Sequence, residues 1–563
     1  MNTAGSRLAR LRAGLGLCLC LLIGPEVPAQ TLTRYDAARF LTQATFGPNE
    51  KDIAHLLAIG RQEWLDEQFG LRAEIKHLKF MPNGMPITPA VTYTFWQQAL
   101  EARAQLRHRV AFALSEIFVI SGQDNCGSSA RQGIASYQDM LAEHAFGTFR
   151  QLIEAVTKHP TMGCYLAHLR NRKTNNLTGR VPDENYAREV MQLFSIGLIA
   201  LNKDGTPRLD AQQRPIETYS SSDVSGLAMV FTGWSWQCPE YPSDGCFQYR
   251  GTAPRSNPPD PWVVAMVPYP QFHDSGAKQF LGVKIREPLL LDADPEKDLN
   301  IALNTLAQHP NVGPFIGKQL IQRLVTSNPS PAYVERVARA FDASNGSLRA
   351  MVQAILLDIE ARQPSPGTPS AQGKVKEPIL RLSALLRAFN ASSATGLFAI
   401  GTYHEASLGL NQSPYEAPSV FNFFRPNFAP SGSHSAQHGM LAPELQIADE
   451  TSMAGYARLM EQVIWAGVGE HVKHRREVIH PSDVKLEYQL DDGAGWLDPA
   501  LTASQLVERI NQRLLLGNMS APLRADIEVA LASLPGLQKD QARKRVWSAL
   551  LLTVVSPEYL VQR

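Results

Sequence analysis

Apolar residues recur at helical spacing through most of this chain, and this periodicity limits its fold more than any other feature. The longest example runs from Trp96 to Phe118, with no helix-breaking residue before Gly122. Its second half is apolar on nearly all sides, which is typical of a helix inside a core. Stretches that alternate like strands are few and short, such as 484–488. We therefore predict an all-α or nearly all-α protein, with a large helical body, long ordered loops and a few short strands.

Further segments share the helical period. They are Asp52–Phe69, Ser136–Glu143, Phe149–Lys158, Ser222–Phe231, Pro295–Gln308, Val312–Val325, Ala332–Phe341, Leu348–Glu360, Pro378–Phe389, Met453–Ala466, Ala503–Leu515 and Gln541–Val555. The chain has 563 residues, 44% of them hydrophobic, which is enough for one large core or two joined cores. A Pro- and Ser-rich segment, 362–370, is the best linker candidate. Residues 30–563 are thus expected to form a single helical domain, or two lobes of about 30–361 and 371–563.

The first 29 residues resemble a cleaved secretory signal. Three arginines at 7, 10 and 12 precede the apolar run 15–23, and a Gly-Pro pair then leads to small residues ending at Ala29. The run is too short to span a bilayer comfortably, and no later segment approaches 18 consecutive apolar residues. We expect a periplasmic or extracellular protein with no membrane attachment after cleavage; the alternative is a retained single anchor.

Cysteine usage agrees with export. Cys18 and Cys20 lie in the predicted signal, and four cysteines remain, an even number for an oxidising compartment. We prefer a pairing of Cys238 with Cys246, which would close a short Pro- and Gly-containing loop. Cys126 would then pair with Cys164. A zinc site is the alternative, but no CxxC spacing favours it.

The charge balance excludes one class of partner. Without the three arginines and one glutamate of residues 1–29, the 54 basic and 53 acidic residues become 51 and 52. A nearly neutral chain argues against bulk electrostatic binding of nucleic acid. There is also no P-loop, no dinucleotide fingerprint in a strand–turn–helix context and no Gly-x-Ser-x-Gly elbow.

The stretch from Pro182 to Leu198 places charged and amide side chains on one face of an otherwise apolar helix. At about 100° per residue, one arc of this helix holds the polar side chains and the other the apolar ones. The polar residues are Glu184, Asn185, Arg188, Glu189, Gln192 and Ser195. Two carboxylates, a guanidinium and two amides are therefore predicted to point the same way. The alternative is a solvated helix face or a set of ion pairs that joins helices.

Two loops carry further candidates. The segment 235–270 is rich in Pro, Gly, Tyr and Trp, and its aromatic rings could stack on sugars or pack the loop against the body. The segment 201–210 places Asn202, Asp204 and Asp210 around a Gly turn, with oxygen ligands that suit calcium. It lacks the acidic residue that ends an EF-hand loop, and a hairpin turn explains Asp-Gly equally well.

Eight blocks in order along the chain carry a family resemblance. They are residues 37–48, 144–150, 159–162, 184–198, 231–234, 272–278, 376–378 and 413–420. They resemble motifs of a large, mostly bacterial secreted family, the domain of unknown function 1800 (DUF1800) family. Phe231-Thr232-Gly233-Trp234 is similar to its LTGW block, and the segment from His273 to Lys278 to its HDxGxK block.

One block departs from the family pattern. Many members carry an aromatic- and histidine-rich FWxxHF block where this chain has residues 112–118, so the histidine of that block is absent here. Glu116 is the only charged residue left in the block. A buried glutamate needs a partner, and Arg109 or His108 could supply it. The pair would be either a core ion pair or part of a catalytic site.

The blocks that match the family suggest a catalytic site. His273 and Asp274 would act as a general acid or base, or as metal ligands, from a loop. Glu184 and Glu189 would supply the paired carboxylates that acetal hydrolysis requires. Arg188 and Lys278 would bind a uronate, sulfate or phosphate. The remaining substrate contacts are assigned to Asn185, Gln192 and Trp234, and the hypothesis is that all these residues line one pocket.

The expected function is that of a hydrolase or lyase acting on an extracellular carbohydrate, with calcium as the one cofactor considered. The alternative is a non-enzymatic protein that binds glycans or assists assembly together with another exported protein. The resemblance implies this second reading, because family members are commonly encoded beside a second secreted family. Turnover distinguishes the two, since only an enzyme changes its substrate when present in catalytic amounts.

Overall fold

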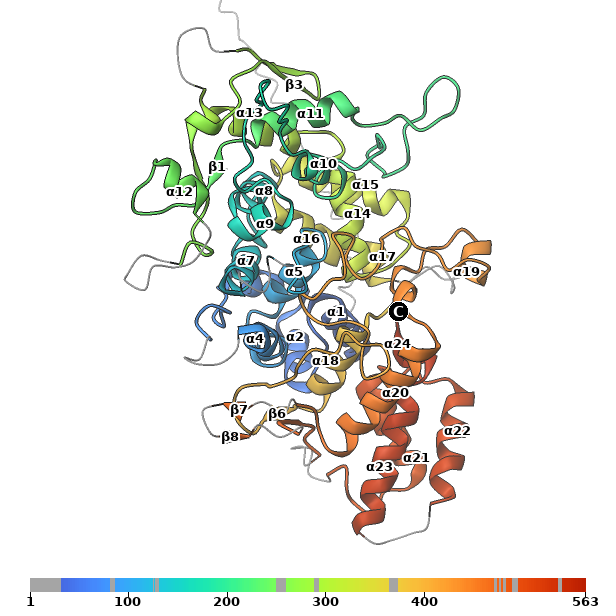
Figure 1. The fold of residues 1–563 in the computed structure, drawn as a ribbon. Coiled ribbons are helices and arrows are strands. Elements are labelled where there is room, and N and C mark those ends of the chain that lie inside the picture. Colours follow the sequence, from blue (N-terminus) through green and yellow to red (C-terminus); the bar gives the residue numbers. More distant parts are fainter. Residues whose placement is uncertain are drawn as a thin grey trace, which may run out of the picture.

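The chain folds into a mostly helical structure, shown in Figure 1. In this computed structural model, the described residues are 32–80, 87–124, 126, 131–249, 260–287, 293–363, 373–469, 473–474, 477–478, 482–488, 495–534 and 539–563. These residues form 23 helices and only short strands in two-stranded sheets. The predicted fold class is confirmed. The proposed signal, 1–29, and most of the proposed linker, 362–370, lie outside the described residues.

The helices before the proposed linker build the first part of the body. They are α1 (Arg34–Ala44), α2 (Glu50–Ile59), α3 (Arg61–Gly70), α4 (Ile87–Glu101), α5 (Gln105–Ser115), α7 (Arg131–His144), α8 (Phe149–Lys158), α9 (Pro160–Tyr165), α10 (Asn185–Gln192), α11 (Ser221–Val230), α12 (Asp244–Gln248), α13 (Pro295–Ala307), α14 (Val312–Leu324), α15 (Pro331–Ala343), α16 (Leu348–Leu357) and α17 (Ile359–Arg362).

The later helices and the strands complete the described elements. The helices are α18 (Pro378–Ala388), α19 (His434–Gln437), α20 (Glu450–Trp465), α21 (Ala503–Leu514), α22 (Ala521–Ala532), α23 (Lys539–Val554) and α24 (Pro557–Leu560), with 3-10 turns at Pro270–Phe272 and Pro443–Ile447. The antiparallel strand pairs are β1 (Trp234–Ser235) with β2 (Val267–Pro268), β3 (Lys278–Phe280) with β4 (Val283–Ile285), β5 (Lys374–Val375) with β10 (Val561–Gln562), β6 (Ser392–Ser393) with β9 (Val484–Lys485), and β7 (Lys473–His474) with β8 (Glu477–Val478).

Most predicted helices lie within a few residues of the observed ones, but the longest prediction was wrong. Residues 96–118 form two helices, because α4 ends at Glu101 and α5 begins at Gln105. The Gln105 amide donates hydrogen bonds to the carbonyls of Gln98, Ala99 and Ala102, at 3.1, 3.2 and 2.9 Å. A distant side chain, Glu74, accepts from the freed backbone N–H of Ala104 at 3.3 Å. Polar side chains thus make hydrogen bonds to the backbone groups left free at the break, where the sequence contains neither Gly nor Pro.

Two large clusters of buried apolar side chains form the core. One runs from Ala37 to Ala361 and is built by the helices before the proposed linker. The other joins helices α18 and α20 to α24 with residues of the first part, among them Phe95, Trp96 and Phe112. The division into two lobes remains a prediction.

The C-terminal end of the chain is tied to its first part. Strand β10 pairs with β5, and the Gln562 amide donates to the carbonyls of Leu324 and Val325 at 2.8 and 3.1 Å. Arg39 Nε of α1 donates to the carbonyl of Arg563 at 2.8 Å. These bonds hold the end of α14 beside β5, next to the pocket described below.

Both predicted disulfides are confirmed: Cys126 pairs with Cys164 and Cys238 with Cys246. The first links residues 38 apart and the second residues 8 apart. Chain-entropy arguments give a crosslink about 4 kcal/mol of stability for the longer loop and about 2.5 kcal/mol for the shorter. We therefore expect Cys126→Ser with Cys164→Ser to lower the urea midpoint more than Cys238→Ser with Cys246→Ser. The reverse order would show that strain or packing, not loop length, decides the effect.

The described part of the chain contains no helix that has both the length and the apolar character needed to cross a membrane.

Candidate functional site

The HDxGxK block forms a buried ionic cluster around an acid that the sequence analysis did not identify. His273 Nε2 lies 3.1 Å, and Lys278 Nζ 2.8 Å, from Oδ2 of Asp298 on α13. The His273 ring is fully buried, and its Nδ1 lies 2.7 Å from the carbonyl of Thr232. Burial opposes ionisation of Asp298, but the hydrogen bonds from His273 and Lys278 prevail and lower its pKa. This cluster joins α11, β3 and α13.

The Asp274 carboxylate joins two turns through hydrogen bonds. Its Oδ2 accepts from the backbone N–H and the hydroxyl of Thr174 at 2.9 and 2.8 Å, and its Oδ1 accepts from the N–H of Gly276 at 2.9 Å. These bonds overcome burial and lower the pKa of Asp274. With its acceptor oxygens occupied and its side chain buried, Asp274 is placed to hold the loop.

The polar stripe on α10 is divided between the surface and the interior. Glu184 pairs with Arg188 at 3.0 Å on the surface and accepts from Ser225 of α11 at 2.6 Å. Asn185 is exposed. Glu189 is buried, its Oε2 has no hydrogen-bond partner among the described residues, and burial raises its pKa. The helix is also shorter than predicted, Asn185–Gln192, so Ser195 lies beyond its end.

The structure brings His273, Asp274 and Lys278 together, and it brings Glu184 and Arg188 together. Among the described residues, no hydrogen bond or ion pair links these two groups. Helix α11 packs against both α10 and β3. It approaches β3 so closely that a Cβ on Gly226 would lie 1.8 Å from the carbonyl oxygen of Gln279.

The side chains proposed as calcium ligands form hydrogen bonds within their own turns. Asp204 accepts from the N–H and hydroxyl of Thr206, and Asp210 accepts from the N–H groups of Gln212 and Arg214 and from the Arg214 guanidinium. Within the described ranges, the one group of residues spaced to hold a metal is Cys238, Glu240 and Cys246. Its two sulfurs form a disulfide, so that group does not fit a metal.

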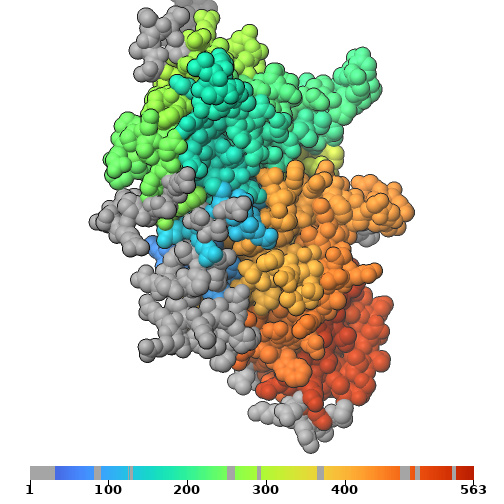
Figure 2. Space-filling view, in the orientation of Figure 1, coloured from blue at the N-terminus to red at the C-terminus, as the bar shows by residue number. Residues whose placement is uncertain are grey.

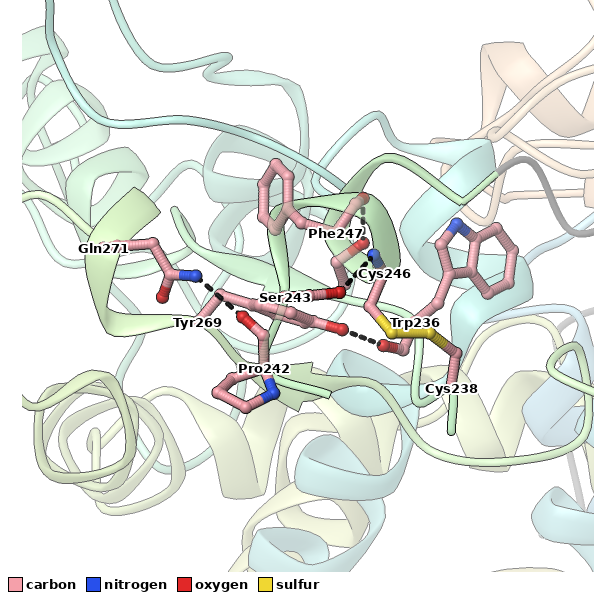
Figure 3. Close-up of a disulfide and its surroundings, with 9 residues drawn as sticks. Trp236, Cys238, Pro242, Ser243, Cys246, Phe247, Tyr269 and Gln271 are labelled. Carbon is pink, nitrogen blue, oxygen red and sulfur yellow. Dashed lines mark hydrogen bonds between the residues drawn. A yellow bond between two sulfur atoms is a disulfide. The ribbon is translucent and has the colours of Figure 1, made fainter. Parts of the chain in front are cut away.

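The aromatic loop packs against the body, as Figure 3 shows around the second disulfide. Trp234, Trp236 and Tyr269 are buried, and the Tyr269 hydroxyl donates to the carbonyl of Trp236 at 2.5 Å. The Gln271 amide donates to the carbonyl of Pro242 at 2.9 Å. Trp234, which was assigned to substrate binding, has Lys158 Nζ 5.3 Å from its ring centre and is 2% exposed.

One serine–histidine pair resembles a nucleophile with its base. Ser136 Oγ lies 3.2 Å from Nε2 of His159, in the lining of a pocket of about 700 Å³. However, Nδ1 of His159 accepts from the N–H of Thr161 at 3.3 Å, so the ring proton must sit on Nε2. Nε2 then donates toward Ser136 and cannot accept its proton. Burial lowers the pKa of His159 to about 3. The pair is a helix cap, not a catalytic dyad.

A second pocket has a volume of about 540 Å³. It lies between the end of α10, the outer face of α14 and the irregular segment 420–427. In Figure 1 the segment that carries α19 lies beside α14 and α17, and Figure 2 shows it on the surface. The polar lining residues are Glu116, Gln192, Lys318, Gln319, Gln322, Arg323, Arg425 and Asn427. The apolar lining includes Leu193, Leu198, Phe315, Val420 and Phe421.

Glu116, the residue left in the divergent family block, lines this pocket and caps the end of α5. Its Oε1 accepts from the Asn422 amide at 3.1 Å, and its Oε2 lies 3.5 Å from Arg323 Nε. Burial, followed by the nearby charge of Glu377, raises the pKa of Glu116 to about 8, against the opposing effect of Arg323. Burial thus favours the protonated form of Glu116.

The basic group that contacts the Glu116 carboxyl is Arg323, while Arg109, one of the two predicted partners, interacts with it through charge alone. Arg109 is completely buried, but it donates to the carbonyl of Arg323 at 2.6 Å, while Arg323 contacts the Glu116 carboxyl. His108 faces elsewhere, toward Glu74. Arg323 lies 207 residues beyond Glu116 in the chain, which is why local sequence reasoning missed it.

A network of buried acids and bases lies behind the pocket. Glu377 accepts from Gln412 at 2.7 Å, and Lys374 pairs with Glu444 at 3.0 Å. Three carboxylate oxygens, Glu116 Oε2, Glu377 Oε1 and Glu444 Oε2, have no hydrogen-bond partner among the described residues. The nearby charge of Glu377 adds to the rise of the pKa of Glu116.

The wall on α14 carries donors with no partner. Lys318 is half-buried, and its ammonium makes no ion pair or hydrogen bond with any described residue. Burial alone accounts for its lowered pKa. The neighbouring Gln319 is buried, and its Nε2 likewise lacks a partner among the described residues. Functional sites often keep such unsatisfied groups for a ligand.

Comparison with known proteins identifies one relationship. A family model described as "Protein of unknown function (DUF1800)" matches residues 39–561. No curated protein matches the chain, and no solved structure does. The family blocks at 376–378 and 413–420 contribute Glu377 to the network behind the pocket and Val420 to its wall.

Proposed function

Because this chain belongs to the DUF1800 family, whose description assigns no activity, we propose a function from its pocket: an exported enzyme that cleaves an extracellular carbohydrate. Glu116 is proposed as the general acid. Gln192 and Gln319 would supply hydrogen bonds to sugar hydroxyls, and Phe315 and Phe421 apolar faces for sugar rings. The two disulfides are compatible with export, because such bonds persist in oxidising compartments.

One observation carries the proposal: a buried carboxyl group, whose pKa is raised by that burial, lines a pocket of ligand size. Cleavage of a glycosidic bond requires a proton for the departing oxygen. Burial and a second carboxyl group are the means by which enzymes hold such a proton. A purely structural ion pair would favour an ionised Glu116, so the raised pKa supports a catalytic role.

The residues that line the pocket bear on whether the bond would be cleaved by hydrolysis or by elimination. Hydrolysis with paired carboxylates needs two acids beside the bond, separated by about 5 Å or more. Glu116 is the single acidic residue among the residues that line this pocket. As the proton donor to the departing oxygen it would serve hydrolysis and elimination alike, and the mass of the products distinguishes the two reactions.

The test is product analysis by mass spectrometry on neutral and acidic polysaccharides, with and without calcium. We expect wild-type protein to release oligosaccharides and Glu116→Gln to release none. Glu296→Gln is the matched control, because it changes a glutamate on α13 whose side chain is 45% exposed and lies outside this lining. Elimination products are lighter than hydrolysis products by one water. If Glu116→Gln and wild type behave alike on every substrate, Glu116 is not the acid.

A further inference from the structure

The pocket contains an excess of positive charge. Its lining includes three basic residues, Lys318, Arg323 and Arg425, and one acid, Glu116. Arg323 is engaged with Glu116 and the carbonyls of Glu116 and Gln319. Lys318 and Arg425 form no ion pair with any described residue. An isolated half-buried ammonium is costly unless an anion accompanies it.

The position of Lys318 adds to this argument. Lys318, Gln319 and Gln322 follow Phe315 at the spacing of one helix face on α14, and all four line the pocket. The Gln322 amide donates to the carbonyls of Ser327 and Pro426, so the face offers the Lys318 ammonium and the Gln319 amide beside an aromatic ring. This combination suits a sugar that carries an anionic group: the ring packs on apolar surface, the hydroxyls meet amides, and the anion meets the ammonium.

The Arg425 guanidinium stands at the opposite wall. It lies 5.1 Å from the ring centre of Phe421, and it is exposed. Held over an aromatic ring, it keeps its charge near the pocket without a carboxylate partner. A second anionic group on the same chain of sugars would find it there, so a repeating acidic polymer fits the pocket better than a single small anion does.

We propose that the pocket selects an acidic oligosaccharide, whose carboxylate or sulfate pairs with Lys318. This inference rests on the proposed function, because it names the substrate class of the same site. Uronate and sulfate groups share the anionic chemistry that Lys318 would recognise, and the experiment separates them.

Calorimetric titration of the whole chain tests the proposal. The probes are an oligouronate, a sulfated oligosaccharide and a neutral oligosaccharide of equal length. We expect an acidic probe to bind at least tenfold more tightly than the neutral one. Lys318→Met should lose about tenfold or more in affinity for the acidic probe, while Lys318→Arg should retain most of that affinity. The weak binding of the neutral probe should not change in either variant. Binding of the uronate alone or of the sulfate alone identifies the anionic group.

Two results would overturn the proposal: equal binding of neutral and acidic probes, or full affinity in Lys318→Met. The Glu116→Gln variant separates this inference from the proposed function. If it and the wild type bind acidic probes equally and neither forms product, the enzyme proposal fails but the binding proposal stands. If neutral glycans are cleaved and acidic ones do not bind, the reverse holds.

Discussion

Asp298→Ala is expected to destabilise the protein by about 3–5 kcal/mol, the range found when one partner of a buried ion pair is removed. Asp298 is the carboxylate on which His273 and Lys278 converge, at 3.1 and 2.8 Å. The Lys278 ammonium is 2% exposed, and without Asp298 the acceptors left to it among the described residues are the carbonyls of Asp274 and Gly276. Chemical unfolding at pH 7 measures the loss.

Glu296→Ala on the same helix is the matched control. Glu296 pairs with Lys158 at 3.0 Å, but its side chain is 45% exposed, so its removal should cost less than 1 kcal/mol. Adding Lys278→Met to Asp298→Ala should recover part of the loss, because the unpaired charge is then gone. A loss below 1 kcal/mol in Asp298→Ala would show that the cluster does not stabilise the fold.

The same cluster gives a pH dependence. The hydrogen bonds from His273 and Lys278 overcome burial and lower the pKa of Asp298 below its ordinary value. The unfolded chain therefore takes up a proton first as the pH falls, and the stability that Asp298 provides is present at neutral pH and lost in acid. We expect the difference between wild type and Asp298→Ala to shrink as the pH falls through the ordinary range for aspartate.

Helical periodicity predicted the fold class and many helix bounds, because the pattern records which side of each helix is buried. Helix α8, Phe149–Lys158, was predicted to the residue, and it has a capping Thr148 and a clear apolar face. The break between α4 and α5 could not be predicted in this way. The break depends on Glu74, which accepts a hydrogen bond from the N–H of Ala104, and on Gln105, which donates to the carbonyl of Gln98. Neither residue type marks a helix end by itself.

The candidate site shows the same limit. Glu189 belongs to the polar arc of α10, yet the fold buries it. Glu116 attracted attention as a lone charge in an apolar helix, and its burial was anticipated. Its partner Arg323 and the neighbouring Glu377 come from α14 and from the segment before α18. Sequence spacing carries no information on such contacts, so the acid could be suspected but its protonation could not.

Glu116→Gln is expected to combine a large loss of activity with no loss of stability at neutral pH. Removing a general acid typically costs about 10²–10⁴-fold in rate. Glutamine has the shape of the protonated acid, and its oxygen can still accept from Asn422. The variant should therefore preserve the contacts of the folded state while losing the proton that the reaction needs.

The pKa of Glu116 determines how the stability difference between the variant and the wild type should change with pH. Burial and Glu377 raise the pKa of Glu116 from 4.5 to about 8. Between these values the unfolded chain has released a proton that the folded chain keeps, so this group lowers stability as the pH rises. Glutamine does not titrate, and the variant should gain stability relative to wild type between pH 5 and pH 8. Thermal unfolding at both pH values measures this gain, and the activity of the wild type should fall above about pH 8. A variant less stable at pH 8 than at pH 5, relative to wild type, would mean that Glu116 is an ionised partner of Arg323 and its role structural.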